Sequence, residues 1–370
     1  MAQPSWFQRF LLPGFAFKAV VIGGGYATGR ELAEFFVSVG PRGGLLAMAL
    51  STVLFSLICV VTFLFARMHG STDYRNFFRN LVGPLWVLYE AAYMFSFVLV
   101  LAVYGAAAGA IGVAMFGWPP IAGVMCLIAS IAVFTMFGNP SVEWLFKYAS
   151  LFLYGVYALF VFWTLQEFGD EAVQGLATPS SYAGWATAGV TYTGYNVLAA
   201  VVILPVLRHL TSTRDAVVAG LLAGPLTMIA AVLFFLCMMA WYPAIGTEVL
   251  PADFMLRQLG MPLLHGTFQL MIFMALLQSG VSSVHAINER IAGYLAERHE
   301  RRFSPLARLA CTSFLLVATI FAAQRFGLVD LIARGYRVLA VLILVTFVLP
   351  LLTFGLWRLV KGRPVTLANA

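Results

Sequence analysis

The chain has 370 residues, of which 62% are hydrophobic and 10% are charged. Because soluble domains carry about 25% charged residues, this composition excludes an ordinary soluble domain and predicts an all-α protein that crosses a membrane several times. The formal net charge is +7, but the basic residues gather in the connections between apolar segments. We therefore attribute the positive charge to membrane topology, and we expect no nucleic-acid partner.

Ten apolar segments are long enough to span a bilayer, which takes roughly 20 residues. With the N-terminus in the cytoplasm, most of the 22 Lys and Arg residues fall on the cytoplasmic side, as the positive-inside rule requires. We therefore predict an integral protein of the cytoplasmic (inner) membrane with both termini in the cytoplasm. The predicted spans are 15–37, 43–66, 84–110, 119–138, 141–165, 184–207, 215–241, 262–288, 305–324 and 334–358.

The first span contains VVIGGGYATGRELAEFF over residues 20–36, which is unusual for a membrane helix. Each glycine disfavours a helix by about 1 kcal/mol relative to alanine, so we predict a break here. The freed N–H groups around residues 27–29 can bind an anion such as a carboxylate, and the carbonyl groups of Ala19 and Ile22 can coordinate a cation. The alternative is that the glycines only permit close helix packing. The predicted substrate-site residues are Gly23, Gly24, Gly25, Tyr26, Ala27, Thr28, Gly29 and Glu31.

The third span carries Glu90 within LYEAAYMFSF. A carboxylate inside a membrane is costly and is usually functional, so Glu90 is a candidate site residue or proton carrier. A structural ion pair is an equal alternative, because Glu90 lies near the end of its span. Tyr93 is a candidate pocket wall.

The sixth span contains GVTYTGYNVLAAVVILP over residues 189–205. Its Gly194-Tyr195 pair follows Gly25-Tyr26 at a separation close to half the chain, so we predict a second break. Interrupted helices at matching positions are typical of inverted repeats, here a five-helix repeat in residues 1–170 and a second in residues 171–370. Non-helical backbone at membrane depth must be buried or line a cavity, so both breaks indicate one shared site. Its further predicted walls are Tyr192, Tyr195 and Asn196.

The eighth span contains LLQSGVSSVHAINER over residues 276–290. Ser279, Ser282 and Ser283 share one helical face. Together with the carbonyl groups of Ala19 and Ile22 they form an oxygen-rich set that suits Na⁺, although serines also serve as packing residues between membrane helices. We assign Gln278 to the substrate pocket and expect no cofactor other than this Na⁺ ion.

GGGYATGRE (23–31) resembles the G-x-G-[FY]-A-[ST]-G-x-E signature in the first helix of the YkvI-like amino-acid permeases, and TYTGYN (191–196) resembles the break in their sixth helix. These permeases belong to the amino acid–polyamine–cation superfamily, which has the bacterial leucine-transporter fold. The resemblance implies alternating access, with substrate held between helices 1, 3, 6 and 8 and Na⁺ between helices 1 and 8. Arg30 departs from the small or amide residue expected before the glutamate, so the nature of the substrate stays open.

The resemblance also implies an alternative to sodium. In some proton-coupled relatives a lysine of helix 5 replaces this ion, and Lys147 lies in the fifth span. A pair with Glu143 on the same helix face explains Lys147 equally well.

We therefore predict a secondary transporter, not an enzyme, for a small amino acid or a related zwitterion or amine, with Na⁺ as coupling ion. An H⁺-coupled transporter or exchanger of an organic amine is the alternative, and a channel is a weaker one. The expected partners are the solute, the coupling cation and the lipid bilayer. Arg334 and Arg337 precede or begin the tenth span, and we expect them to line the outer vestibule.

Overall fold

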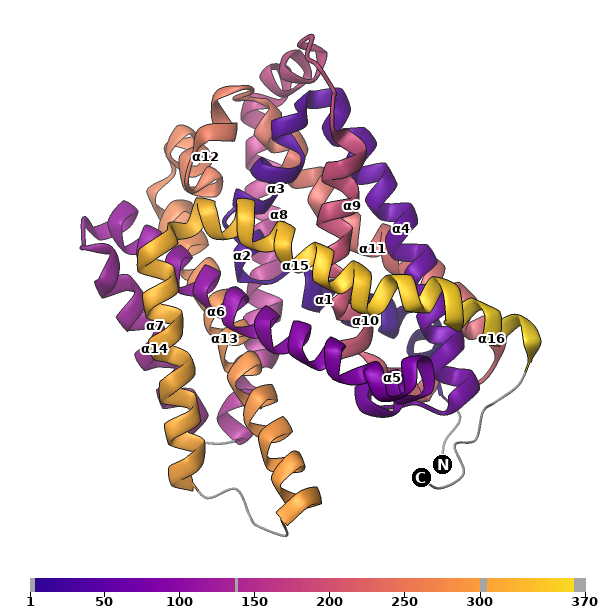
Figure 1. Cartoon of the computed structure of the whole chain (residues 1–370). Helices are drawn as coiled ribbons and strands as arrows, with labels where there is room; N and C mark the ends of the chain where they lie inside the picture. Colours follow the sequence, from indigo (N-terminus) through magenta and orange to yellow (C-terminus); the bar gives the residue numbers. More distant parts are fainter. Residues whose placement is uncertain (1–3, 137–138, 300–304, 363–370) are drawn as a thin grey trace.

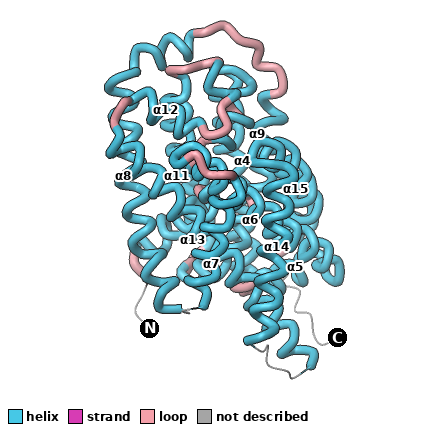
Figure 2. The backbone as a smooth tube through the Cα atoms, turned by 90° about the vertical axis from the view of Figure 1, so that its left-hand side faces the viewer, coloured by secondary structure: helices cyan, strands magenta, loops and turns pink. Residues whose placement is uncertain are grey.

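The computed structural model describes residues 4–136, 139–299 and 305–362, and these residues contain helices and loops but no strand (Figures 1 and 2). The first predicted span is divided into four short helical pieces. The next spans form long helices, with the short helix α5 on the surface between two of them. The helices of this half are η1 (Phe7–Leu11), α1 (Leu12–Val21), α2 (Gly24–Ala27), α3 (Arg30–Phe35), η2 (Val37–Val39), α4 (Gly40–His69), α5 (Tyr74–Val82), η3 (Gly83–Leu85), α6 (Trp86–Phe116), α7 (Pro120–Met136) and α8 (Asn139–Ala177).

The second half has the same mixture of long and interrupted helices. Its helices are α9 (Trp185–Asn196), α10 (Leu198–Val202), η4 (Leu204–His209), α11 (Thr213–Met239), η5 (Ala244–Thr247), α12 (Pro251–Leu259), α13 (Pro262–His299), α14 (Pro305–Asp330), η6 (Leu331–Gly335), α15 (Tyr336–Ile343), η7 (Leu344–Val348), η8 (Leu351–Gly355) and α16 (Leu356–Lys361). Every predicted span therefore coincides with helical segments, and the all-α fold class is confirmed.

Five helical runs among the described residues are long and apolar enough to cross a membrane. They are Arg30–His69, Tyr74–Phe116, Thr213–Met239, Pro262–Val284 and Val317–Lys361. The number of ten spans stays a prediction, because the first and sixth spans are broken into short pieces and the side chains of residues 135–151 lie outside the described part.

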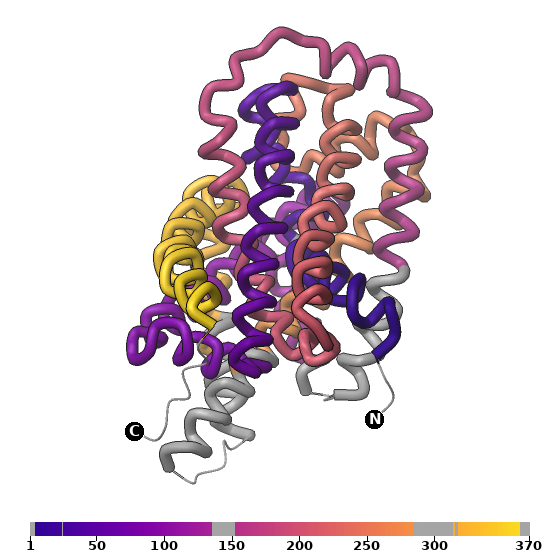
Figure 3. Tube along the Cα trace, turned by 90° about the vertical axis from the view of Figure 1, so that its right-hand side faces the viewer, coloured from indigo at the N-terminus to yellow at the C-terminus, as the bar shows by residue number. Residues whose placement is uncertain are grey.

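The two faces of the molecule are distinct. η1, α5 and α16 lie on the side where both ends of the described chain are found, which we call the terminal face (Figures 1 and 3). α12 and the connection between α8 and α9 lie on the opposite side, the far face (Figures 1 and 3).

The pieces of the first span lie inside the bundle. α1 packs against α11, α2 against α13 and α6, and α3 against α9. Buried aromatic rings fix this arrangement: Phe17 of α1 lies 5.3 Å from Phe55 of α4, and Tyr192 of α9 lies 4.7 Å from Phe36, measured between ring centroids. Burying such rings is the largest apolar contribution that single side chains make, so the interrupted helix is held by packing on several sides.

The break in the first span is confirmed, and it is double. Ile22 (ψ 73°) and Gly23 (ψ −170°) leave the helical conformation, and Gly29 adopts a left-handed conformation with φ 79° before α3 begins. The predicted break in the sixth span is much weaker. Only Val197 separates α9 from α10, and its backbone keeps helical angles (φ −65°, ψ −13°). The glycines of this span, Gly184, Gly189 and Gly194, stand singly, whereas the first span has three in succession, so the sixth helix is less easily opened.

We expect Gly29→Ala to destabilise the protein. A β-carbon in the left-handed region costs roughly 1–2 kcal/mol, and here it would also lie 2.8 Å from Cε1 of Phe234. Thermal unfolding in detergent should show a lower midpoint. Gly155→Ala is the matched control, because Gly155 lies within α8 and a β-carbon there meets nothing within 4 Å. An equal effect of both substitutions would contradict this account of Gly29.

Candidate functional site

The main chain at Ile22–Gly23 is the centre of the candidate site. The N–H of Gly23 would bond to the carbonyl of Ala19 in a continuous helix, but it donates to the carbonyl of Val21 instead, at 3.0 Å. The Ala19 carbonyl thus loses its usual helical partner. Such carbonyl groups at a helix break are suited to coordinate cations.

Side chains from two other helices reach this break. A β-carbon on Gly23 would lie 3.1 Å from the hydroxyl oxygen of Tyr104 (α6) and 3.5 Å from Oγ of Ser279 (α13). At Gly25 a β-carbon would lie only 2.6 Å from Oε1 of Glu31 and 3.6 Å from the Tyr336 hydroxyl oxygen. These two glycines therefore allow polar side chains to lie directly against the main chain.

Glu31 is a buried carboxylate beside the break, and its side chain points back toward it. The residue is 5% exposed, and the hydroxyl of Tyr195 (α9) donates a hydrogen bond to its Oε2 at 2.6 Å. Five buried tyrosines surround it closely enough for electrostatic interaction: Tyr26, Tyr104, Tyr192, Tyr195 and Tyr336. A carboxylate among aromatic rings is an arrangement that suits a cationic group.

Several predicted residues gather here, and others support them. Gly23, Gly25, Glu31, Tyr195 and Ser279 lie at the break itself. Gly24 begins α2, and the Tyr26 ring lies 6.4 Å from that of Phe234. Ala27 is buried, and the Thr28 hydroxyl donates to the carbonyl of Gly25 at 2.7 Å. Tyr192 packs against Tyr195 at 5.7 Å between centroids, and the Asn196 amide donates to the Tyr192 carbonyl at 3.0 Å.

Glu90 and Tyr93 are not brought to this site. The hydroxyl of Tyr74 on α5 donates to Oε1 of Glu90 at 3.3 Å, and the Tyr93 ring packs 4.5 Å from that of Phe97. Glu90 lies thirteen residues before Val103, the α6 residue nearest Gly25, which is about 20 Å along a helix. Both side chains belong instead to an aromatic cluster near the terminal face.

The predicted sodium ligands are only partly brought together. The hydroxyls of Ser282 and Ser283 donate to the carbonyls of Gln278 and Ser279, at 2.8 and 2.9 Å. Because each hydroxyl hydrogen is bonded to a carbonyl of the same helix, the hydroxyl oxygen keeps lone pairs that can coordinate a cation. Gln278 is half-buried beside Ser279. The side chains of Glu143 and Lys147 lie outside the described part of the chain.

On the far-face side of the site, Arg30 links α3 to η5 and to the segment between η5 and α12. Its Nη1 donates to the carbonyls of Gly246 and Glu248, at 2.9 and 2.8 Å, and its Nη2 donates to Oε2 of Glu34 at 3.1 Å. Arg337 of α15 donates to the other oxygen of Glu34 at 3.1 Å. We call Arg30, Glu34 and Arg337 the far-face network. Arg334 contacts Asp330 instead, at 3.5 Å.

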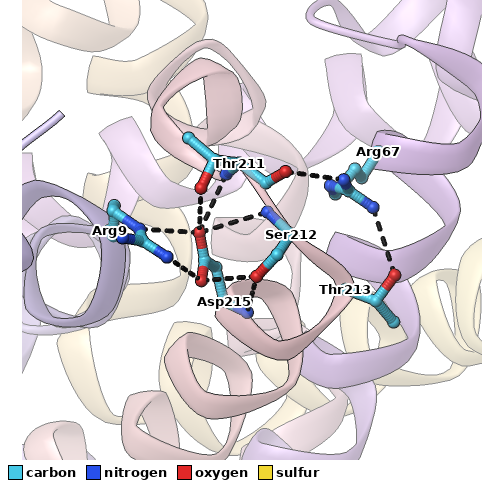
Figure 4. Close-up of polar contacts among 6 residues, drawn as sticks. All are labelled: Arg9, Arg67, Thr211, Ser212, Thr213 and Asp215. Atoms are coloured by element: carbon cyan, nitrogen blue, oxygen red, sulfur yellow. Dashed lines mark hydrogen bonds and ion pairs between the residues drawn. The ribbon is translucent and has the colours of Figure 1, made fainter. Parts of the chain in front are cut away.

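On the terminal face, Arg9 of η1 binds Asp215 of α11 through two hydrogen bonds of 2.9 and 2.7 Å (Figure 4). Asp215 also accepts hydrogen bonds from Thr211 and Ser212 and completes the capping box of α11. The hydrogen bonds to Asp215 raise the pKa of the Arg9 guanidinium above its ordinary value. We call the pair the terminal-face latch.

Five residues of these assemblies were not predicted from the sequence: Tyr104, Tyr336, Glu34, Arg9 and Asp215. Tyr104 stands singly in an apolar span, and Tyr336 lies between Arg334 and Arg337 without a pattern that indicates a binding residue. For Asp215 a local signal exists, because Ser212 three residues earlier forms a helix-capping pattern with it, but this pattern says nothing about Arg9.

No protein-family profile matches the sequence, and a search of the curated proteins finds no match. Solved structures do match. MhsT in complex with L-phenylalanine superposes with a TM-score of 0.57 at 15% identity, over 98% of this chain and 99% of that one. A Na⁺-coupled sialic acid symporter gives a TM-score of 0.57 at 15% identity, over 95% and 81%. The manganese transporter of Eremococcus coleocola gives 0.51 at 14%, over 97% and 81%.

The chain has the LeuT fold. With its long apolar helices it is an integral membrane protein. The LeuT fold is known from transporters, but a fold alone does not define a function. The features that bear on function are the interrupted first span and the two charged assemblies on either side of it.

We expect Tyr195→Phe to weaken the binding of a solute at the break. The substitution removes the hydroxyl that bonds to Glu31, and a lost hydrogen bond to a charged group lowers affinity about tenfold. The measurement is the thermal stabilisation produced by amino acids and amines in a solute screen. Tyr182→Phe, at an exposed position in the connection before α9, is the control. If both variants respond to solutes like the wild type, Glu31 and Tyr195 are not part of a binding site.

Proposed function

We propose that the chain is a secondary active transporter that moves a small amino acid, or a related zwitterion or amine, across the membrane by alternating access, with Na⁺ as coupling ion. The observation that carries this proposal is the break at Ile22–Gly23, which lies next to the buried Glu31 carboxylate. A helix used only as an anchor has no use for exposed main chain and a buried charge at this depth.

The fold supports transport but does not define the substrate. The three structures described above are named with phenylalanine, sialic acid and manganese, so the residues of this chain have to indicate the substrate. The N–H groups of Ala27, Thr28 and Gly29, predicted to be free, donate instead to the carbonyls of Gly23 and Tyr26. In our proposal the ammonium group of the solute therefore lies against Glu31 and the surrounding tyrosines, while a carboxylate, if the solute has one, meets N–H groups at the start of α2.

An organic amine without a carboxylate is the second candidate, because Glu31 and the tyrosines alone suffice to bind it. Glu31 is also a group that could carry a proton, and this supports H⁺ coupling or exchange as the alternative to Na⁺. For the Na⁺ site we retain Ala19, Ile22, Ser279, Ser282 and Ser283 as proposed ligands.

The two charged assemblies fit the roles of gates. We propose that both termini lie in the cytoplasm of a cell whose inner membrane holds the protein, so that the far face is external. The far-face network then closes the outer entrance and the terminal-face latch the inner one, and transport requires each to open in turn. We further propose that residues 1–170 and 171–370 form inverted repeats that move relative to each other as the two faces open in turn. We also propose that the chain is related to the YkvI-like permeases of the amino acid–polyamine–cation superfamily.

We expect Ser282→Ala combined with Ser283→Ala to abolish any sodium-dependent stabilisation. A bound ion stabilises the folded state by RT ln(1 + [L]/Kd), so the increase in melting temperature on adding Na⁺ should disappear, and so should Na⁺-driven uptake in proteoliposomes. Ser130→Ala is a matched control, because the Ser130 hydroxyl makes the same kind of bond, to the Cys126 carbonyl four residues earlier on α7. A sodium response that survives the double substitution would place the ion elsewhere.

We expect Arg9→Gln to open the terminal face. The substitution removes the latch, while Asp215 keeps its bonds to Thr211 and Ser212. A cysteine introduced at the buried Val21 of α1 should therefore react several times faster with a maleimide. Arg42→Gln, an exposed arginine at the start of α4, should leave the reaction rate unchanged. Equal rates in both variants would show that the latch does not control access.

A further inference from the structure

A cavity of about 760 Å³ lies apart from the interrupted helix, between α6, α7, α14 and the segment around α12. Its walls are made of small apolar residues, among them Ala106, Ala110 and Gly327. At Gly105 the helices α6, α7 and α14 are in close contact, because a β-carbon there would lie 3.5 to 3.6 Å from Val124, Ala323 and Thr319. The volume is that of a small-molecule pocket.

The edge of this cavity at α12 is charged. Asp253 is fully engaged: Nε2 of His265 lies 2.7 Å from its Oδ1, the Gln269 amide donates to the same oxygen at 2.5 Å, and Arg257 binds Oδ2 at 2.5 Å. The Arg257 side chain is 54% exposed and keeps further donors. The half-buried Glu248 side chain has neither an ion pair nor a hydrogen bond with any residue that the structure describes.

We propose that this cavity binds a phospholipid with an ethanolamine headgroup, taken from the membrane leaflet at the far face. Its ammonium group lies on Glu248, its phosphate on Arg257, and an acyl chain lies along the apolar walls. Glu248 and the remaining donors of Arg257 are opposite in charge to the ammonium and the phosphate of this headgroup. Val113 and Ile121 line the cavity with 45% and 36% of their surface exposed, which gives the acyl chain a way in from the bilayer.

The position of Glu248 couples this lipid to the far-face network. Glu248 lines the cavity, and its main-chain carbonyl accepts the hydrogen bond from Arg30. Four residues later, the N–H of Ala252 donates to the carbonyl of Thr28 at 3.1 Å. A lipid bound to Glu248 therefore holds the segment to which both Arg30 and the interrupted helix are attached, and it favours the closed far face.

The test is native mass spectrometry of the delipidated, full-length protein in detergent. Three lipids with identical acyl chains are added in equal amounts, with ethanolamine, choline or glycerol headgroups. The ethanolamine lipid should form the dominant complex, because choline has no N–H donors and the glycerol lipid has no cation. Glu248→Gln should reduce the preference for ethanolamine about tenfold. Glu171→Gln, at an exposed position on α8, should leave it unchanged.

A second pair of variants keeps the test decisive if Glu248→Gln disturbs folding. Arg257→Gln should weaken all three lipids through the phosphate, and Ala110→Leu should do so by filling the cavity. Equal binding of the three headgroups by the wild type overturns the proposal, and so does an ethanolamine preference that survives Glu248→Gln. Binding is read without transport, so the result does not depend on the proposed function.

Discussion

Main chain that leaves its helix inside a membrane protein has to be shielded from lipid on every side, and the rest of this structure depends on that constraint. Side chains of α6 and α13 cover Gly23, Tyr336 of α15 lies near Gly25, and the buried Glu31 is bonded to Tyr195 of α9. An unpaired carboxylate at this depth would be costly, so the hydroxyl and the surrounding tyrosines are a condition for placing a charge there. The aromatic packing of Phe17, Phe55 and Tyr192 holds the same region.

The two charged assemblies lie on opposite sides of this centre. The far-face network joins α3 to α15 and to the segment before α12, and the terminal-face latch joins η1 to α11. The far-face network contains first-span residues that follow the break, Arg30 and Glu34, whereas the latch contains Arg9, which precedes it. A movement of α1 or α3 relative to the bundle therefore changes one assembly without directly changing the other. This independence is what the proposed alternating access requires.

Local composition predicted most of the fold. Apolar run lengths located the helices, and three successive glycines located the break, because both signals lie in short stretches of sequence. The sixth span is divided as predicted, into α9, α10 and η4, but its interruption is milder than that of the first span because Val197 keeps helical angles. In the site, Glu31 and Tyr195 were predicted from their motifs. Tyr104 and Tyr336 were not, since their proximity to the break depends on how α6 and α15 pack. Glu90 was misplaced because depth along a helix does not reveal which neighbours a side chain meets.

The capping box of α11 gives the latch a further property. Asp215 accepts hydrogen bonds from Ser212 and Thr211 as well as from Arg9, and these cap interactions are local to the start of its own helix. When Arg9 departs, the carboxylate keeps partners, and the first turn of α11 keeps its cap. Undocking of the N-terminal segment thus requires no unravelling of the element it docks on. The contact can therefore be broken and remade without partial unfolding of α11.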